Sequence, residues 1–343
     1  MDPKKLSALD EIIKTDYPNL AGLVVCHNGR RELEAYYNGF TAEHQFHVFS
    51  VTKSIVSLLI GIALERGEIT GVDQKILDFF PEFPVRKGHE LLRQVTLKHC
   101  LTMTVPYRFR FNPYTKYFTS DDWVGFALNQ IGGRGQLGEF RYAPIIGPDI
   151  LTGILTRATG KTVLDYAREH LFDPLGIAIE KSLFFETKEE QMDFYKAATN
   201  SCWVCGPNKI NTAGWGLTLS AREMAAIGEC CIHGGQVDGK QIIPQAWLKE
   251  STRTQSCWEK RNLNYGYLWW IVEEAEPSFA ALGDGGNAIY VNPQKNLVVA
   301  IASTFVPRVK DRRQERLNRS AKRIDGTRSE WSNENEVIAD ESD

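Results

Sequence analysis

A serine and a lysine three residues apart, Ser50 and Lys53, form the pattern with the clearest chemical meaning in this sequence. A serine hydroxyl attacks a carbonyl carbon only when a neighbour accepts its proton, and a lysine in an apolar pocket has a lowered pKa and can help to do so. The same spacing also arises by chance. Ser50 could instead cap a helix while Lys53 extends to water.

The residues after this pair favour a buried helix. Apolar side chains recur at helical spacing, at Ile55, Leu58, Leu59 and Ile62. This repeat predicts a helix that begins near Ser50 and ends at Gly67. Ser50 and Lys53 would then share one face of its first turn. The helix dipole and free backbone N–H groups there add positive potential beside a carbonyl under attack.

Strands are predicted at both ends of the chain and helices in the middle. A helix at residues 4–14 precedes strands at 21–26 and 31–37, which an Asn-Gly turn joins. Further strands are expected at 267–272, 287–291 and 297–302. Apolar stripes predict six helices between them, at 51–66, 91–101, 121–130, 149–159, 163–171 and 221–233. This order indicates an α/β (α+β) fold in which a large helical lobe interrupts an antiparallel sheet.

We expect one catalytic domain over residues 1–325, followed by an acidic tail at 326–343. Its α/β lobe would comprise residues 1–48 and 260–325, and its helical lobe residues 49–259. The active site would lie where the lobes meet. A basic helix is possible at 310–323.

Composition excludes several classes of protein. With 343 residues, 43% hydrophobic residues and a net charge of −3, the chain has ample core and an ordinary surface, so neither nucleic acid nor an anionic membrane is an expected partner. The first residues lack the pattern of a secretory signal, and no apolar run is long enough to span a bilayer, so we expect a cytoplasmic protein.

Seven cysteines, an odd number, favour reduced thiols over a disulfide framework. Cysteines 202, 205, 230 and 231 with His233 could supply zinc ligands, but their spacing is atypical and buried cysteines often act as small apolar residues. We therefore expect no metal and no cofactor.

The segment Ser50-Val-Thr-Lys53 with its apolar helix resembles the SxxK helix of class C β-lactamases, penicillin-binding proteins and related serine esterases. Segments 73–81, 96–104, 171–177 and 215–224 resemble further landmarks of this family in the same order. The resemblance covers about residues 20 to 305. It implies a β-lactamase/transpeptidase-like fold, with terminal helices flanking the sheet, and a serine nucleophile at Ser50.

The resemblance also implies a tyrosine in a second motif, usually Tyr-x-Asn, which accepts the serine proton and later activates water. Tyr142 in Phe-Arg-Tyr-Ala-Pro is at the expected place, and the Lys53 ammonium could lower its pKa from about 10. Tyr142 could also be a packing aromatic. Pro144 departs from the family pattern, because proline has no side-chain amide to donate to a substrate.

A third motif of the family is similar to Gly-Asp-Gly-Gly-Asn at residues 283–287 and most resembles the version in esterases and in amidases of the aminohexanoate-oligomer type. Glycine lets a backbone N–H approach a substrate oxygen, so Asp284, Gly285 and Gly286 are candidates to complete an oxyanion hole with the Ser50 N–H. They could also form only a hairpin turn. Asp284 replaces the usual positive group, which disfavours anionic substrates. Asn287 is a candidate pocket residue.

Aromatic residues follow segment 96–104, and Tyr107 and Phe109 are candidates for a substrate pocket, although packing between the lobes is the more common role for such residues. Three functions stay open. The favoured one is an esterase or amidase that forms an acyl-enzyme on a small ester or amide. The others are a β-lactamase or D-alanyl peptidase, and a binding protein that has lost turnover. The oligomeric state is not predicted.

Overall fold

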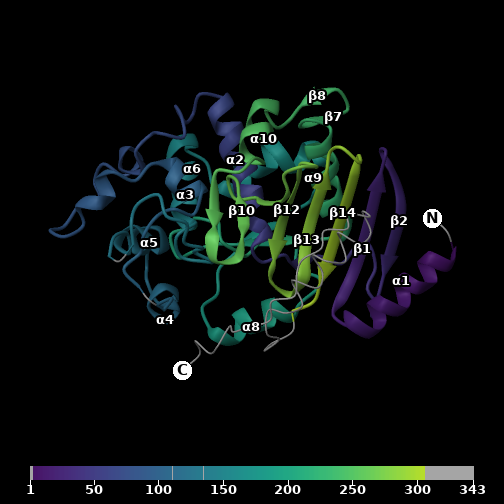
Figure 1. Ribbon diagram of the computed structural model, residues 1–343. Coiled ribbons are helices and arrows are strands. Elements are labelled where there is room, and N and C mark those ends of the chain that lie inside the picture. The colour runs from purple at the N-terminus through teal and green to yellow at the C-terminus, as the bar shows by residue number, and fades with distance from the viewer. Residues whose placement is uncertain (1–2, 110, 134, 306–343) are drawn as a thin grey trace.

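Within the part of the chain that the structure describes, eight strands form one antiparallel sheet in the order β2-β1-β14-β13-β12-β11-β10-β9, which brings residues 20–36 beside residues 256–303 (Figure 1). The computed structural model describes residues 3–109, 111–133 and 135–305. The strands are β1 (Leu20–His27), β2 (Arg30–Tyr36), β9 (Ser256–Trp258), β10 (Leu263–Tyr265), β11 (Trp270–Glu273), β12 (Ser278–Gly283), β13 (Asn287–Asn292) and β14 (Leu297–Ser303). The predicted fold class, an antiparallel sheet with a helical insertion, is confirmed.

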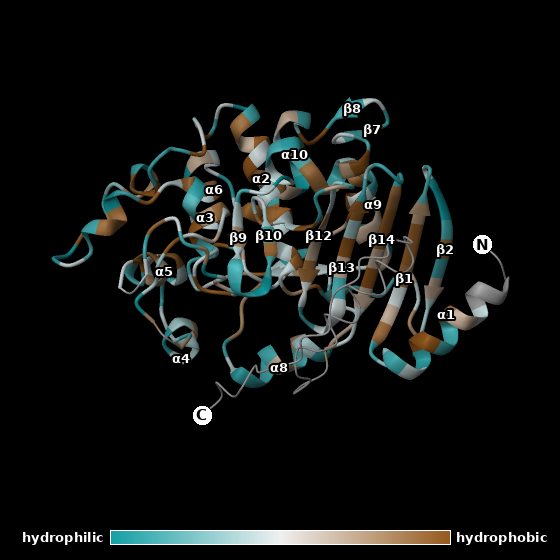
Figure 2. Ribbon diagram, viewed as in Figure 1, coloured by the Kyte–Doolittle hydropathy of each residue, from teal (hydrophilic) through white to brown (hydrophobic). Residues whose placement is uncertain are grey.

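The central strands are buried because helices cover both faces of the sheet. Every residue of β13 and β14 is buried, and these strands stand out as apolar in Figure 2. Helix α1 (Pro3–Asp16) packs on one face through residues such as Ile13. On the other face lies α9 (Ala221–Ile232), whose Gly228 leaves no room for a side chain beside Val298. The positions 310–323, where a basic helix was considered, and the tail at 326–343 lie outside the described residues.

Helix α2 (Val51–Glu65) lies between the sheet and the helical lobe, and all of its residues from Val51 to Ala63 are buried. The lobe around it contains α3 (Leu97–Leu101), α4 (Tyr114–Phe118), α5 (Trp123–Asn129), α6 (Asp149–Thr159) and α7 (Val163–Ala167). Since α2 belongs to the cores of both lobes, its first turn is held firmly where they meet.

Three predicted elements are wrong in detail. Residues 91–101 do not form one helix, because Thr96 is extended and begins α3 with a capping box that includes His99. The strand expected at 267–272 begins only at Trp270, since Leu268 adopts a left-handed backbone conformation with φ of 64°. The helix expected at 163–171 ends as α7 at Ala167 and continues as a π-helical turn, Arg168–Phe172.

The remaining elements are short and were not predicted from the sequence. They are β3 (Phe46–His47), β4 (Lys181–Leu183), β5 (Cys202–Val204), β6 (Thr218–Leu219), β7 (Gln236–Val237), β8 (Lys240–Gln241), α8 (Lys188–Lys196), α10 (Gln245–Ser251), and the 3-10 turns η1 (Ile76–Phe79), η2 (Glu90–Arg93), η4 (Asp173–Leu175), η5 (Glu259–Arg261) and η6 (Asp284–Gly286). Among these, β3 lies just before α2 in the chain, and its pairing with β6 holds the segment that leads to Ser50.

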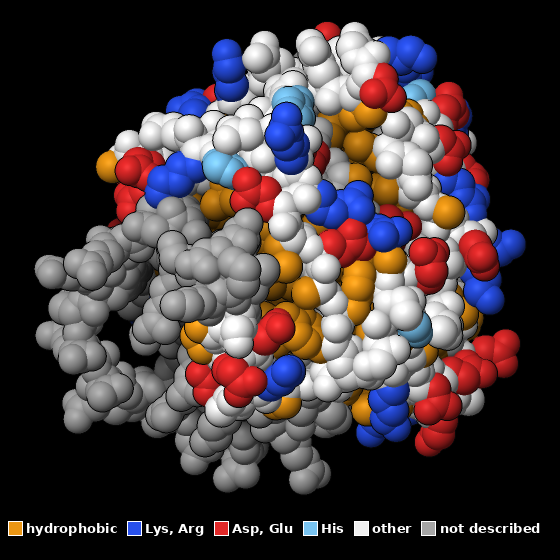
Figure 3. Space-filling view, turned by 90° about the vertical axis from the view of Figure 1, so that its right-hand side faces the viewer, with side chains coloured by type: hydrophobic (Ala, Val, Ile, Leu, Met, Phe, Trp, Pro, Cys, Tyr) orange, Lys and Arg blue, Asp and Glu red, His pale blue; other side chains and the backbone are white. Residues whose placement is uncertain are grey.

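Acidic and basic side chains are intermingled on the face shown in Figure 3, with hydrophobic atoms visible between them. Over the described part of the chain, no helix has both the length and the apolarity needed to cross a membrane. The seven cysteines are free thiols, and six of them are buried.

Candidate active site

Ser50 directly precedes α2, and its side chain makes no capping hydrogen bond to that helix. Its Oγ instead accepts a hydrogen bond from the Lys53 ammonium group, with 2.8 Å between Nζ and Oγ. The alternative in which Ser50 only caps the helix and Lys53 extends to water is therefore wrong, because Lys53 is 1% exposed. The structure brings the two predicted residues together at the N-terminal end of a buried helix.

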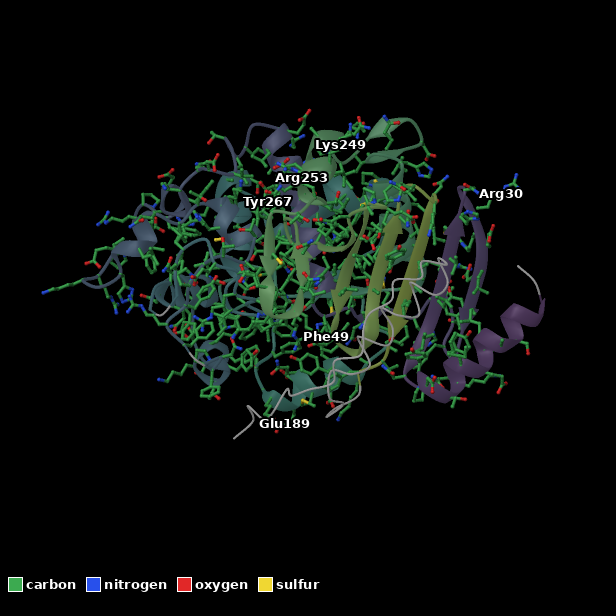
Figure 4. The ribbon with its side chains drawn as sticks, viewed as in Figure 1. Arg30, Phe49, Glu189, Lys249, Arg253 and Tyr267 are labelled. Carbon is green, nitrogen blue, oxygen red and sulfur yellow. The ribbon has the colours of Figure 1, made fainter. Side chains whose placement is uncertain are left out.

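The turn that presents Ser50 is strained. Phe49 has a positive φ of 48°, a conformation that side-chain-bearing residues seldom adopt. Its ring lies 3.9 Å from the His47 ring and 5.9 Å from that of Tyr195 in α8, measured between centroids. Figure 4 labels Phe49 near the ends of the strands, on the side of the molecule where α8 lies. This aromatic packing holds the strained backbone and thereby fixes the position of Ser50.

Lys53 makes two further hydrogen bonds, both to backbone carbonyl oxygens. Its Nζ is 2.6 Å from the oxygen of Pro144 and 2.7 Å from that of Gly214. Burial lowers the pKa of Lys53 to about 7, an effect that the nearby carboxylates of Asp284 and Asp149 partly oppose. Lys53 therefore gives up its proton more readily than a solvent-exposed lysine does.

The two carbonyl groups determine where the Lys53 lone pair points. A carbonyl oxygen only accepts hydrogen bonds, so Pro144 and Gly214 each require one N–H of Lys53. When Lys53 is protonated, its third N–H is directed at Ser50. When it is neutral, the lone pair takes that position and faces the serine hydroxyl. The geometry thus allows direct proton transfer from Ser50 to Lys53.

Tyr142 lies beside this pair, with the Lys53 nitrogen 5.3 Å from the centre of its ring. The half-buried ring also stacks at 6.4 Å on Trp258 and packs at 5.5 Å against Trp270. Tyr142 is thus both close to Lys53 and part of an aromatic cluster. It therefore has the packing role that was considered as an alternative from the sequence. Pro144 contributes its backbone oxygen, which accepts a hydrogen bond from Lys53.

The third motif lies next to the residues that precede Ser50. Gly283 is in contact with Val48, because a β-carbon at Gly283 would be 2.1 Å from the Val48 oxygen. Gly285 has a φ of 78°, which favours glycine. The residues do turn a hairpin, since β12 and β13 pair as far as Gly283 and Asn287. This hairpin turn therefore sits against the residues that precede Ser50.

Side chains behind the motif hold its backbone in place. Asn287 is fully buried, and its amide donates to the Asp284 oxygen at 2.9 Å and accepts from the Ser303 N–H at 3.0 Å. Asn19 donates to the Gly285 oxygen at 2.8 Å. The prediction that Asn287 lines a pocket is therefore wrong, because its polar atoms are used within the protein. Asp284 is exposed and its charge reaches Lys53.

The other two candidate pocket residues pack together. Tyr107 is 4% exposed, and Phe109 stacks on it with 5.4 Å between ring centres. Arg141 donates to the backbone oxygen of Tyr107 at 2.7 Å and lies over the Phe109 ring. Tyr107 is thus a core residue, which corrects its assignment to the pocket, whereas Phe109 stays partly exposed.

Three residues around Lys53 were missed from the sequence: Tyr117, Asp149 and Gly214. Asp149 is 2% exposed, and it bonds Tyr117 and the backbone beside Gly214. A carboxylate at the first position of an otherwise apolar helix pattern was the only local signal. Its partners are 32 and 64 residues away, so spacing could not have identified them.

No group of three or more His, Cys, Asp or Glu side chains among the described residues could hold a metal ion. The cysteines of the zinc pattern considered above are instead buried, and burial raises the pKa of Cys202 and Cys230 to about 12.

Comparisons with known sequences and with solved structures agree on one family. A family model described as Beta-lactamase matches residues 14–322. The chain is 25% identical over 312 residues to an uncharacterised protein of Alkalihalophilus pseudofirmus, covering 82% of this chain and 83% of that one. It is 21% identical over 303 residues to the 6-aminohexanoate-dimer hydrolase of Paenarthrobacter ureafaciens, covering 81% and 71%. A solved family VIII carboxylesterase superposes with a TM-score of 0.68 at 18% identity, covering 93% and 96%.

Proposed function

Because the chain belongs to the Beta-lactamase family, we propose that it is a serine hydrolase that forms an acyl-enzyme on Ser50 with a small ester or amide. The observation that carries this proposal is the 2.8 Å hydrogen bond between Lys53 and Ser50 inside a buried site. The similar proteins named as an amide-type dimer hydrolase and a carboxylesterase support this class of substrate.

In the proposed first step, neutral Lys53 accepts the Ser50 proton while Oγ forms a bond to the substrate carbonyl carbon. The Ser50 N–H and an N–H of Asp284 or Gly285 stabilise the negative oxygen that results. The bond to the alcohol or amine then breaks, and the leaving group takes the proton. We assign the transfer of that proton to Tyr142, whose ring lies beside Lys53.

In the second step, water attacks the acyl group on Ser50. The same bases accept the proton of the water, and the proton returns to Ser50 as the acid leaves. This assignment makes Lys53 the first proton acceptor, whereas the family resemblance had favoured Tyr142. The direct hydrogen bond between Lys53 and Ser50 supports the change.

Two features favour neutral or cationic substrates over anionic ones such as β-lactams. Asp284 places an exposed carboxylate in the third motif, where its charge reaches Lys53. Pro144 has no amide with which to bind a substrate oxygen, and its own carbonyl is occupied by Lys53. Hydrolysis of β-lactams or D-alanyl peptides is therefore the second candidate. A binding protein without turnover is third, because the serine and lysine are in hydrogen-bonding contact.

The proposal is tested with purified protein, p-nitrophenyl acetate and butyrate, nitrocefin and a fluorophosphonate probe. We expect ester turnover and labelling in the wild type, and loss of both in Ser50→Ala. Ser57→Ala is the matched control, because it makes the same change two turns along α2 at a fully buried site. Fast nitrocefin opening with no ester turnover would favour the β-lactamase. A folded wild type without turnover or labelling would favour the binding protein.

A further inference from the structure

Asp149 is a carboxylate buried at the start of α6, and its charge acts on Lys53. It is 2% exposed. Its Oδ1 accepts the Ala213 N–H at 2.8 Å, and its Oδ2 accepts the hydroxyl hydrogen of Tyr117, which is also fully buried. Burying a carboxylate costs several kcal/mol unless nearby groups compensate it, so a residue of this kind calls for an explanation.

The backbone that Asp149 anchors belongs to the Lys53 site. Gly214 follows Ala213 and also donates its N–H to Asp149, while its carbonyl accepts from Lys53 at 2.7 Å. Gly214 also packs against the other acceptor, since a β-carbon there would lie 2.7 Å from the Pro144 oxygen. The backbone turn at residues 213–214 thus connects the Asp149 carboxylate to the Lys53 ammonium group.

The charges around this turn complement one another. The titratable groups that face Asp149 are Tyr117 of α4 and Lys53 of α2, and the turn at 213–214 contributes only backbone N–H groups. Burial raises the pKa of Asp149 to about 6, although Tyr117, the backbone donors and Lys53 all favour its charged form. In return, the Asp149 charge favours the protonated form of Lys53, as does Asp284 from the third motif.

We propose that Asp149 is a positioning residue for Lys53: it fixes the backbone turn whose Gly214 carbonyl orients the lysine, and it compensates the lysine charge inside the protein. This inference rests on the proposed function for its effect on catalysis. Its effect on the protonation of Lys53 does not depend on turnover.

The test compares Asp149→Asn, Asp149→Ala and the wild type. Asparagine keeps an acceptor for one N–H but removes the charge, so the pKa of Lys53 should fall and the acid limb of kcat/KM should move to lower pH. Alanine also removes the anchor, so the plateau value should fall about 10²-fold, as for a misplaced catalytic group. Asp78→Asn is the matched control at an exposed carboxylate. Circular dichroism and Tm verify that each variant is folded.

A second measurement keeps the two proposals separate. The titration of Lys53, followed by NMR of ¹³C-labelled lysine and assigned with Lys53→Met, needs no activity. A lower Lys53 pKa in Asp149→Asn supports the inference even if the wild type proves inactive. The inference is overturned if the Asp149 variants keep the wild-type Lys53 pKa, the wild-type pH profile and the wild-type plateau of kcat/KM. The proposed function would still stand in that case. If the Asp149 variants do not fold, Tyr117→Phe provides the test. Loss of the Tyr117 hydrogen bond disfavours the Asp149 charge, so the Lys53 pKa should again fall. An unchanged Lys53 pKa in Tyr117→Phe would contradict the inference.

Discussion

Lys53 and Ser50 are joined by a 2.8 Å hydrogen bond across the first turn of α2, and two backbone carbonyls hold the lysine in the orientation that this bond requires. The arrangement gives a serine hydroxyl an adjacent base whose pKa is about 7.

Replacement of the base should abolish acylation. We expect Lys53→Met to lower the rate of fluorophosphonate labelling about 10²- to 10⁴-fold, the usual contribution of a positioned proton acceptor. Labelling kinetics followed by intact mass measure this effect, with Ser57→Ala as the control on the same helix. Labelling of Lys53→Met at the wild-type rate would remove the lysine from the mechanism.

Activity should rise with pH through about 7. Burial lowers the pKa of Lys53, so the amine is protonated below that value and cannot accept the Ser50 proton. Below it, kcat/KM should therefore fall about tenfold for each pH unit. The profile is measured with p-nitrophenyl butyrate after correction for spontaneous hydrolysis. A profile that is flat across neutral pH would exclude Lys53 as the titrating base.

Replacement of Tyr142 and replacement of Lys53 should affect turnover and fluorophosphonate labelling differently. If Tyr142 passes the proton to the leaving group, Tyr142→Phe should slow turnover of esters and amides but should slow fluorophosphonate labelling much less, because fluoride leaves without a proton. Comparing the two rates in Tyr142→Phe and Lys53→Met measures the difference. Equal loss of labelling in both variants would instead make Tyr142 the first proton acceptor, as the family resemblance implied.

Asp284 should select against negatively charged substrates. We expect Asp284→Asn to raise kcat/KM for an anionic ester, p-nitrophenyl hemiglutarate, relative to neutral p-nitrophenyl butyrate by about tenfold, which corresponds to about 1.4 kcal/mol of relieved repulsion. Asp238→Asn changes an exposed carboxylate on the turn between β7 and β8 and serves as the control. The prediction fails if the ratio of the kcat/KM values for the two substrates does not change in Asp284→Asn.

The contact between the third motif and the nucleophile turn should tolerate no side chain. A β-carbon in Gly283→Ala would lie 2.1 Å from the Val48 oxygen, so we expect a loss of about 1–3 kcal/mol in stability together with slower labelling. Gly71→Ala is the matched control, since nothing lies within 4 Å of its added carbon. Thermal unfolding and labelling are compared, and identical values for both variants would contradict the close packing.

The sequence predicted what depends on local spacing. The α2 helix and the positions of Ser50 and Lys53 follow from an apolar repeat and a short motif, and α6 begins and ends as expected. Asp149 was placed correctly in that helix, but its function depends on Ala213 and the following glycine, which tertiary packing brings to it. The burial of Asn287 likewise follows from contacts with distant strands, which residue type does not reveal.

The strands of the sheet edge were missed for a related reason. Both β9 and β10 are three residues long, and their side chains are largely half-buried, so they show little alternation. Their aromatic residues matter because Trp258 and Tyr265 pack around Tyr142. Strands of this length are defined by their neighbours rather than by their own sequence.

The central claim is that Ser50 carries the acyl group, and trapping the intermediate tests it most directly. The wild type is mixed with p-nitrophenyl butyrate, quenched in acid within the first turnovers, digested and mapped by mass spectrometry. We predict a butyryl group on the peptide that contains Ser50, and none on that peptide in Ser50→Ala. Ester turnover with no acylated peptide, or with the acyl group on another residue, would contradict the account.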